Sequence, residues 1–174
     1  MSVRRALSVV LTVALLGAVG AFVAQAFPGL VGADYAFVVQ SGSMEPAIPI
    51  GSVVFVDAVE SGQVDTRITE GEVITYTDDG ENLITHRVVE KHQAGDSVRF
   101  VTKGDANENA DPEPVYRNEI VGELRFAVPL IGYVVAFGNT QMGYLALVLV
   151  PVMLLIFNEL WELYRAMEPE TDHD

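Results

Sequence analysis

The stretch from Ala36 to Pro46 reads AFVVQSGSMEP, and the rest of the chain is organised around it. Its first part, Ala36–Gln40, is rich in aromatic and β-branched residues and predicts a short strand. Its second part, Ser41–Pro46, places two serines around a glycine, and the proline that follows prevents a helix from starting cleanly. A serine on such a turn can present its hydroxyl outward. Most hexapeptides of this composition are only turns, so other residues must decide whether this one is catalytic.

The composition excludes several classes of function. The 174 residues carry a formal net charge of −14, and lysine is reduced to Lys91 and Lys103. This charge argues against a nucleic-acid partner, because phosphate binding needs clustered lysine and arginine. The chain has no cysteine, which excludes disulfides, thiol catalysis and cysteine-ligated zinc. Strong acidity with few lysines is typical of a surface adapted to high salt, so we expect a halophilic source.

The N-terminal region predicts a membrane anchor over residues 1–28. The run from Ala6 to Ala26 carries no charge and is long enough to cross a hydrocarbon core as a helix. Arg4 and Arg5 precede it and are expected to stay in the cytoplasm, which sends the following residues outward. A cleavable secretory signal is the alternative, since Ala24–Ala26 has the small residues of a cleavage site. The uncharged run is longer than a signal core, which favours the uncleaved anchor.

The C-terminal region is apolar again. Residues 131–141 form a membrane-proximal segment, and residues 142–160 predict a second transmembrane helix with Trp161 and Tyr164 as interfacial anchors. An interfacial hairpin or a buried helix is the alternative for this segment. Residues 161–174 are expected to be an acidic cytoplasmic tail, disordered over 168–174.

The middle of the chain, residues 29–130, predicts an antiparallel β domain. It shows no helical periodicity of any length between residues 34 and 127, and its apolar runs are short and separated by turn residues. Loops are expected over 60–70 and 104–117, a hairpin turn over 78–82, and a polar turn around His92. The expected strands are 36–40, 51–56, 72–77, 83–90, 97–102 and 119–126.

Two further features could support chemistry at the serine turn. His86 lies in an expected strand, where alternation places it on one face with Ile84 and Val88. The run from Lys103 to Pro112 is an acidic loop, whose spacing does not match a calcium-binding loop, so we expect no metal site and no cofactor. A lone strand histidine is more often structural, and an acidic loop is more often a solvated turn. Their combination with an exposed serine in one small domain favours a serine hydrolase.

Five segments resemble the type I signal peptidases. The sequence is similar to the archaeal and endoplasmic-reticulum branch, in which histidine replaces the lysine base of the bacterial enzymes. The similarity covers most of residues 35–132 and implies a mainly β catalytic domain of that family's antiparallel fold, flanked by N- and C-terminal transmembrane helices. The matching segments are Ser41–Pro46, Glu70–Tyr76, Thr85–Val88, Thr102–Asp105 with Asp111, and Ile120–Pro129.

The resemblance implies a role for each residue of the site. Ser43 would be the nucleophile and His86 its general base. Asp111 would orient the imidazole, and Asp105 would be a second important acid of the loop; the choice between these two as the triad acid stays open. Ser41 would donate its hydroxyl to the oxyanion, beside the backbone N–H of Ser43. Neutral imidazole with a carboxylate on its other nitrogen is suited to this work near pH 7.

One position departs from the family pattern. Many relatives have two asparagines after the Gly-Asp pair, whereas this chain has Ala106 and Asn107. The departure leaves the serine and histidine assignments intact and weakens any role that rests on the first asparagine.

The resemblance also implies the substrate and its surroundings. The enzyme would remove signal peptides from secreted preproteins by cutting after small residues, and we expect the substrate to add as a β-strand beside Ala36–Gln40. The expected partners are these preproteins, the lipid bilayer and the secretion translocon, with the chain in the cell membrane as a multi-pass protein and its catalytic domain outside. The expected substrate-binding residues are Ala36, Phe37, Val38, Val39, Gln40 and Met44.

Two other hypotheses remain at this point. The chain could be a non-catalytic, membrane-tethered β module that binds peptides or serves as a subunit. It could also keep the catalytic fold and use a Ser–Lys pair with Lys103, although that lysine lies in the acidic loop rather than in the histidine's strand.

Overall fold

The computed structural model describes residues 3–78, 82–95 and 97–167, and these divide into two units. One unit is the β region, Ala21–Val135, and the other combines the two ends of the chain, Met1–Gly20 and Ala136–Asp174. The predicted five-part division of the chain stays a prediction. The helices are α1 (Val3–Ala26), the 3-10 helix η1 (Pro28–Val31), α2 (Val64–Arg67), α3 (Ile131–Gly138) and α4 (Gln141–Met167).

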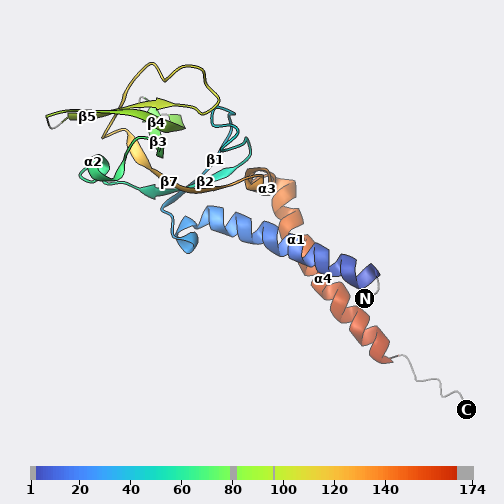
Figure 1. The fold of residues 1–174 in the computed structure, drawn as a ribbon. Helices are drawn as coiled ribbons and strands as arrows, with labels where there is room; N and C mark the ends of the chain where they lie inside the picture. The colour runs from blue at the N-terminus through green and yellow to red at the C-terminus, as the bar shows by residue number, and fades with distance from the viewer. Residues whose placement is uncertain (1–2, 79–81, 96, 168–174) are drawn as a thin grey trace, which may run out of the picture. The chain divides into compact units, whose positions relative to one another are not determined.

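A seven-stranded antiparallel sheet forms the β unit, with the strand order β1-β2-β7-β3-β4-β5-β6 (Figure 1). The predicted antiparallel β domain is therefore confirmed. β1 and β6 are the two edge strands, and β3, β4 and β5 are consecutive neighbours. The strands are β1 (Tyr35–Val38), β2 (Val53–Ala58), β3 (Val73–Asp78), β4 (Asn82–Ala94), β5 (Ser97–Lys103), β6 (Val115–Tyr116) and β7 (Ile120–Val128).

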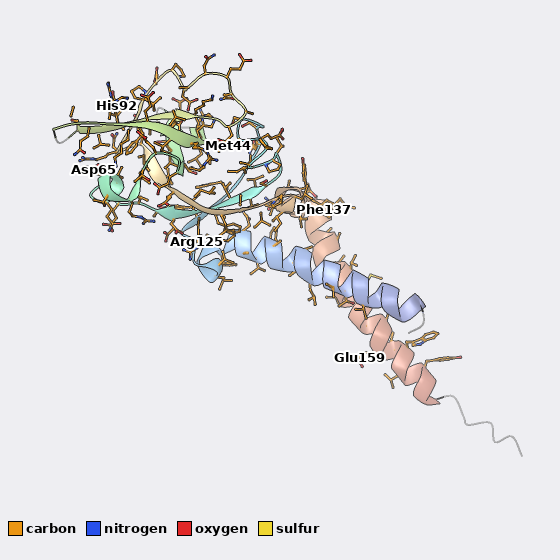
Figure 2. The ribbon with its side chains drawn as sticks, in the orientation of Figure 1. Met44, Asp65, His92, Arg125, Phe137 and Glu159 are labelled. Carbon is orange, nitrogen blue, oxygen red and sulfur yellow. The ribbon has the colours of Figure 1, made fainter. Side chains whose placement is uncertain are left out.

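Three local predictions were wrong. His92 lies in β4 rather than in a turn, because β4 continues to Ala94 and pairs with β5 (Figure 2). The loop expected over 60–70 contains the short helix α2, in which Val64 is completely buried, as is Ile68 directly after the helix. One turn is too short to give a periodic signal. The loop expected over 104–117 contains β6, a two-residue strand paired with β5.

Two other predictions concern residues that the structure does not describe. Residues 79–81 of the expected hairpin turn lie outside the described residues, although β3 and β4 pair on either side of it. The expected tail 168–174 also lies outside them.

Alternation along β1 splits its side chains between two parts of the core. Phe37 pairs with Val54 and packs into a cluster that contains Met44, which is 2% exposed. Ala36 and its alternate neighbour Val38 pack on the opposite face, in a different cluster. A one-residue slip of β1 would exchange these faces, so burial on both sides fixes the register of the strand that leads into the serine turn.

The helices of the chain ends agree in position with the predicted apolar segments. α1 covers the run from Ala6 to Ala26, and α4 covers residues 142–160, with a break before it at Asn139 and Thr140. Within 3–78, 82–95 and 97–167, however, none of the helices combines the length and apolarity that a membrane span requires. The predicted transmembrane helices and multi-pass arrangement are therefore not supported.

Candidate functional site

The serine turn is held from both sides. Met44 and Ile48 are buried, and the Ile48 N–H donates to the Met44 carbonyl at 2.8 Å, which anchors the turn in the core. On the other side, the Ala106 N–H donates to the Ser43 carbonyl at 2.8 Å. Ser43 itself is half-buried, and its hydroxyl oxygen lies 3.3 Å from that of Ser41. The turn therefore presents two hydroxyls close together on a backbone fixed at both ends.

The backbone N–H of Ser43 is available for a ligand. In the part of the chain that the structure describes, it donates to no acceptor. An N–H and the adjacent Ser41 hydroxyl are the donor types that can stabilise a developing oxyanion. The Ser41 and Ser43 assignments from the sequence thus correspond to groups that lie on one turn.

His86 projects from β4 and is 8% exposed, with Ile84 and Val88 on the same face as predicted. Its Nδ1 lies 2.7 Å from Asp111 Oδ2. We assign the ring proton to Nδ1, because an ionised carboxylate can only accept. The lone pair of Nε2 is then free to take a proton from another group, which is what a general base requires.

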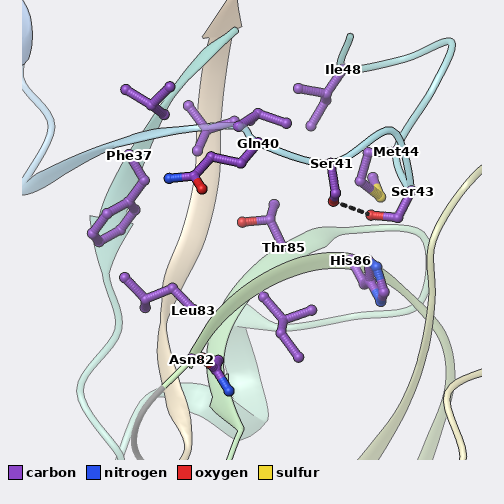
Figure 3. A pocket seen from close by; sticks show the side chains of 14 residues that line it. Phe37, Gln40, Ser41, Ser43, Met44, Ile48, Asn82, Leu83, Thr85 and His86 are labelled. Carbon is purple, nitrogen blue, oxygen red and sulfur yellow. Dashed lines mark hydrogen bonds between the residues drawn. The ribbon is translucent and has the colours of Figure 1, made fainter. Parts of the chain in front are cut away.

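Nε2 faces the serine turn and the loop that follows β5. A Cβ built on Gly104 would lie 3.0 Å from His86 Nε2 and 2.6 Å from the Ser43 carbonyl oxygen, so one point of this loop touches both residues. Figure 3 shows the Ser43 and His86 side chains facing the same groove. In the described chain Ser43 Oγ makes no hydrogen bond to the imidazole. Catalytic hydrogen bonds are often long without substrate and shorten in the complex.

Asp105 has a different partner from Asp111. Arg87 Nε and Nη2 donate to its two oxygens at 2.8 and 2.7 Å, and Arg87 Nη1 donates to the Gly71 carbonyl at 2.8 Å. The hydrogen bond with Asp105 raises the pKa of Arg87 above its ordinary value. Of the two acids left open by the sequence, Asp111 is the one on the histidine, and Asp105 holds the neighbouring arginine.

Lys103 lies apart from these contacts. It pairs with Arg87 across β4 and β5, and its Nζ donates to the Glu108 carbonyl at 3.2 Å. The preceding residue, Thr102, is fully buried, so alternation directs the lysine to the other face of the sheet. The lysine is not among the residues that line the groove at Ser43.

A groove of about 670 Å³ runs past Ser43 and His86 (Figure 3). Of the six predicted substrate-binding residues, Ala36 does not line this groove and packs against the cluster around Val53. The groove wall opposite β1 comes from the start of β4, and it was not predicted from the sequence. It could have been predicted, because these residues directly precede His86 on the same strand. The lining includes five of the six predicted substrate-binding residues, Phe37, Val38, Val39, Gln40 and Met44, together with Asn82, Leu83, Ile84 and Thr85.

Known proteins share this sequence pattern. No protein-family model matches the chain. The signal peptidase complex catalytic subunit SEC11 of Colletotrichum graminicola is 36% identical over 108 residues, which cover 56% of this chain and 59% of that protein. The sec11 subunit of Neurospora crassa is 35% identical over 105 residues, with the same two shares. Signal peptidase I W of Bacillus subtilis is 40% identical over 77 residues, which cover 44% of this chain and 39% of that protein.

These matches confirm the resemblance to type I signal peptidases. The chain spans less than two thirds of the length of the relatives it matches, at 59% for the two fungal subunits. The matched relatives include both a signal peptidase complex subunit and a bacterial signal peptidase I.

Gly104→Ala tests the close contact between the serine turn and the loop after β5. The added Cβ would meet backbone at 2.6 Å, so we expect the two segments to separate and the Ala106 N–H to lose its bond to Ser43. Because one hydrogen bond is lost, we expect the amide hydrogen of Ala106 to exchange with solvent about tenfold faster, which NMR can measure. Gly62→Ala is the matched control, because a Cβ there meets nothing within 4 Å. Unchanged exchange at Ala106 would contradict the close contact.

Proposed function

We propose that this relative of the type I signal peptidases is a serine endopeptidase that removes N-terminal signal peptides from secreted preproteins, cutting after small residues. The observation that carries the proposal is the 2.7 Å contact between His86 Nδ1 and Asp111 Oδ2, with the serine turn on the Nε2 side of the ring. A carboxylate, an imidazole and a serine in this order are the parts of a hydroxyl nucleophile with its base.

The proposed reaction begins at the Ser43 hydroxyl. His86 Nε2 takes its proton while Oγ attacks the scissile carbonyl, and Asp111 stabilises the imidazolium that forms. The oxyanion accepts hydrogen bonds from the Ser43 N–H and the Ser41 hydroxyl. The imidazolium then gives its proton to the leaving amine, and water, deprotonated by the same ring, releases the acyl group from Ser43. In this mechanism Asp105 supports the site through Arg87 and does not touch the reacting atoms.

Cleavage of a preprotein by the full chain in high salt tests these roles. We expect Ser43→Ala and His86→Ala each to lower kcat by about 10³-fold or more, because each removes a member of one catalytic unit. Lys103→Ala should retain activity, since its amine contacts the Glu108 carbonyl instead of the serine. His92→Ala, in the outer part of β4, is the matched histidine control. Full activity in Ser43→Ala would favour a non-catalytic peptide-binding module, and loss in Lys103→Ala would favour a Ser–Lys pair.

The free edge of β1 suits an extended substrate. Val39 donates to Ser52 and accepts from Gly51, so its backbone groups face β2. Alternation then directs the backbone groups of Val38 and Gln40 to the outer edge, beside the groove. A substrate strand could pair with these groups and place its side chains against the apolar lining.

Backbone N-methylation of a peptide substrate tests this strand pairing. We expect methylation at one or more of the residues just before the cut to lower kcat/KM by about tenfold, the cost of one lost hydrogen bond with its clash. A peptide methylated far upstream of the cut serves as the control. If every methylated peptide is cut as fast as the parent, the substrate does not pair with β1.

The long helices support a site of action at a lipid bilayer. On α1, Val13 and Leu16 are 63% and 65% exposed, and on α4, Met153 is 67% exposed. Exposed apolar side chains gathered in this way are typical of surfaces that contact lipid or protein. In this proposal the chain lies at the cell membrane with its β unit on the extracytoplasmic side, where the secretion translocon is a candidate partner. A halophilic source stays a prediction from composition.

Flotation of the full chain with phosphatidylcholine vesicles tests the lipid contact. We expect the chain to float with the vesicles, and the double variant Leu16→Glu with Met153→Glu to bind about tenfold more weakly or less, because carboxylates resist transfer into hydrocarbon. The double variant Gln63→Glu with Asn118→Asp adds the same charge to the β unit and should float normally. Equal flotation of both double variants would contradict a lipid contact through the helices.

A further inference from the structure

Three donors converge on one oxygen of the carboxylate beside His86. Asp111 Oδ2 lies 2.7 Å from His86 Nδ1, 2.6 Å from Thr102 Oγ1 and 3.1 Å from the Tyr76 hydroxyl. Asp111 Oδ1 makes no hydrogen bond in the described chain. The carboxylate is therefore bound through a single oxygen that two hydroxyls share with the imidazole.

The sheet register brings these donors together from three neighbouring strands. Residues directly opposite each other on paired strands project from the same face. Ile74 pairs with His86, which places the alternate residue Tyr76 on the histidine's face, and Thr102 pairs with Val88, the alternate neighbour of His86 on β4. The rings of Tyr76 and His86 meet edge to face, with centroids 6.5 Å apart.

Asp111 comes from the least regular segment of the site. The residues just before it, Glu108 to Ala110, are exposed, and its own backbone is tied to the sheet by one bond, from its N–H to the Thr102 carbonyl at 2.8 Å. A short carboxylate side chain can rotate and offer either oxygen, or neither, to a neighbour. Contacts from fixed strands are needed to hold Oδ2 toward the ring.

We propose that Tyr76 and Thr102 are positioning residues that hold the Asp111 carboxylate with Oδ2 toward His86. This inference rests on the proposed function, because it gives the two hydroxyls a part in the same catalytic unit. Both are well placed for it. Tyr76 is 6% exposed and Thr102 is fully buried, so their side chains are fixed by packing and the contacts are shielded from water.

Both hydroxyls are donors under working conditions. Burial, followed by the charge of Asp111 and the hydrogen bond to it, raises the pKa of Tyr76 to about 12, although the Thr102 hydroxyl opposes this shift. The phenol therefore keeps its proton at any pH at which an imidazole base works. Thr102 has one proton, and its shorter contact is with Asp111 at 2.6 Å rather than with the Tyr76 oxygen at 3.2 Å. Asp111 Oδ2 is thus the common acceptor.

The test uses two variants that keep the shape of the core. Tyr76→Phe and Thr102→Val each remove one donor, and we expect each to lower kcat about five- to tenfold with little change in KM, the effect of one hydrogen bond that orients the base. The double variant should lose more than either single variant. In the NMR spectrum of the full chain, the His86 Nδ1–H resonance should broaden through faster solvent exchange in each variant and vanish in the double variant.

Two matched variants separate positioning from a merely structural role. Thr102→Ser keeps the hydroxyl and should restore both kcat and the Nδ1–H resonance. Thr75→Val removes another fully buried hydroxyl, bonded to Thr85 and not to Asp111, and should leave both readouts unchanged. An unchanged resonance and kcat in Tyr76→Phe and Thr102→Val, or equal loss in Thr75→Val, would overturn the inference. Failure of the wild-type chain to cut any preprotein would count against the proposed function, while the resonance still reports on the positioning.

Discussion

The contact between one carboxylate oxygen and three neighbouring strands determines the geometry of the whole site. Asp111 Oδ2 accepts from side chains of β3, β4 and β5, so the acidic loop is attached to the sheet at that oxygen. The same loop carries Ala106, whose N–H holds the Ser43 carbonyl. The serine turn, the histidine strand and the acid are consequently not three independent placements. A shift of the loop would move the acid from the ring and the loop from the serine turn together.

The separation of the two loop acids has an electrostatic reason. Arg87 follows His86 on β4, and its guanidinium is a permanent cation that needs a carboxylate partner. Asp105 binds this guanidinium through both oxygens, which offsets its charge, while Asp111 remains for the histidine. Asp105 thus has a permanent cation, Arg87, as its partner. The partner of Asp111 is His86, which is a cation only while it holds the proton of the proposed reaction. If Asp105 turned to the histidine instead, Arg87 would lose both of its hydrogen bonds to that carboxylate.

The sequence predicted the local elements that carry the candidate site better than it predicted the contacts between them. Local patterns placed Ser43 on a turn and His86 on an alternating strand, whereas their proposed roles came from the resemblance to type I signal peptidases. The choice between Asp105 and Asp111 could not be made, since both lie in one loop and only its path over the sheet decides which reaches the ring. Tyr76 was missed for a related reason. Alternation shows which face of its own strand a residue occupies, but it does not show which residue lies beside it on the neighbouring strand. The short helix α2 and strand β6 gave no signal because each is too short to show a periodic pattern.

The groove depends on the same long-range register as Ser43, His86 and Asp111. One wall is the edge strand β1 with its turn, and the other is the start of β4, which continues directly into His86. Any peptide that lies between these walls is thereby aligned with the histidine on one side and with Ser43 on the other. The alternation that packs Phe37 against one core cluster and Ala36 against another also turns the outer backbone groups of β1 toward the groove. An exposed strand edge is a liability in most proteins, and here it lies beside Ser43, where the substrate strand of the proposed function would pair with it.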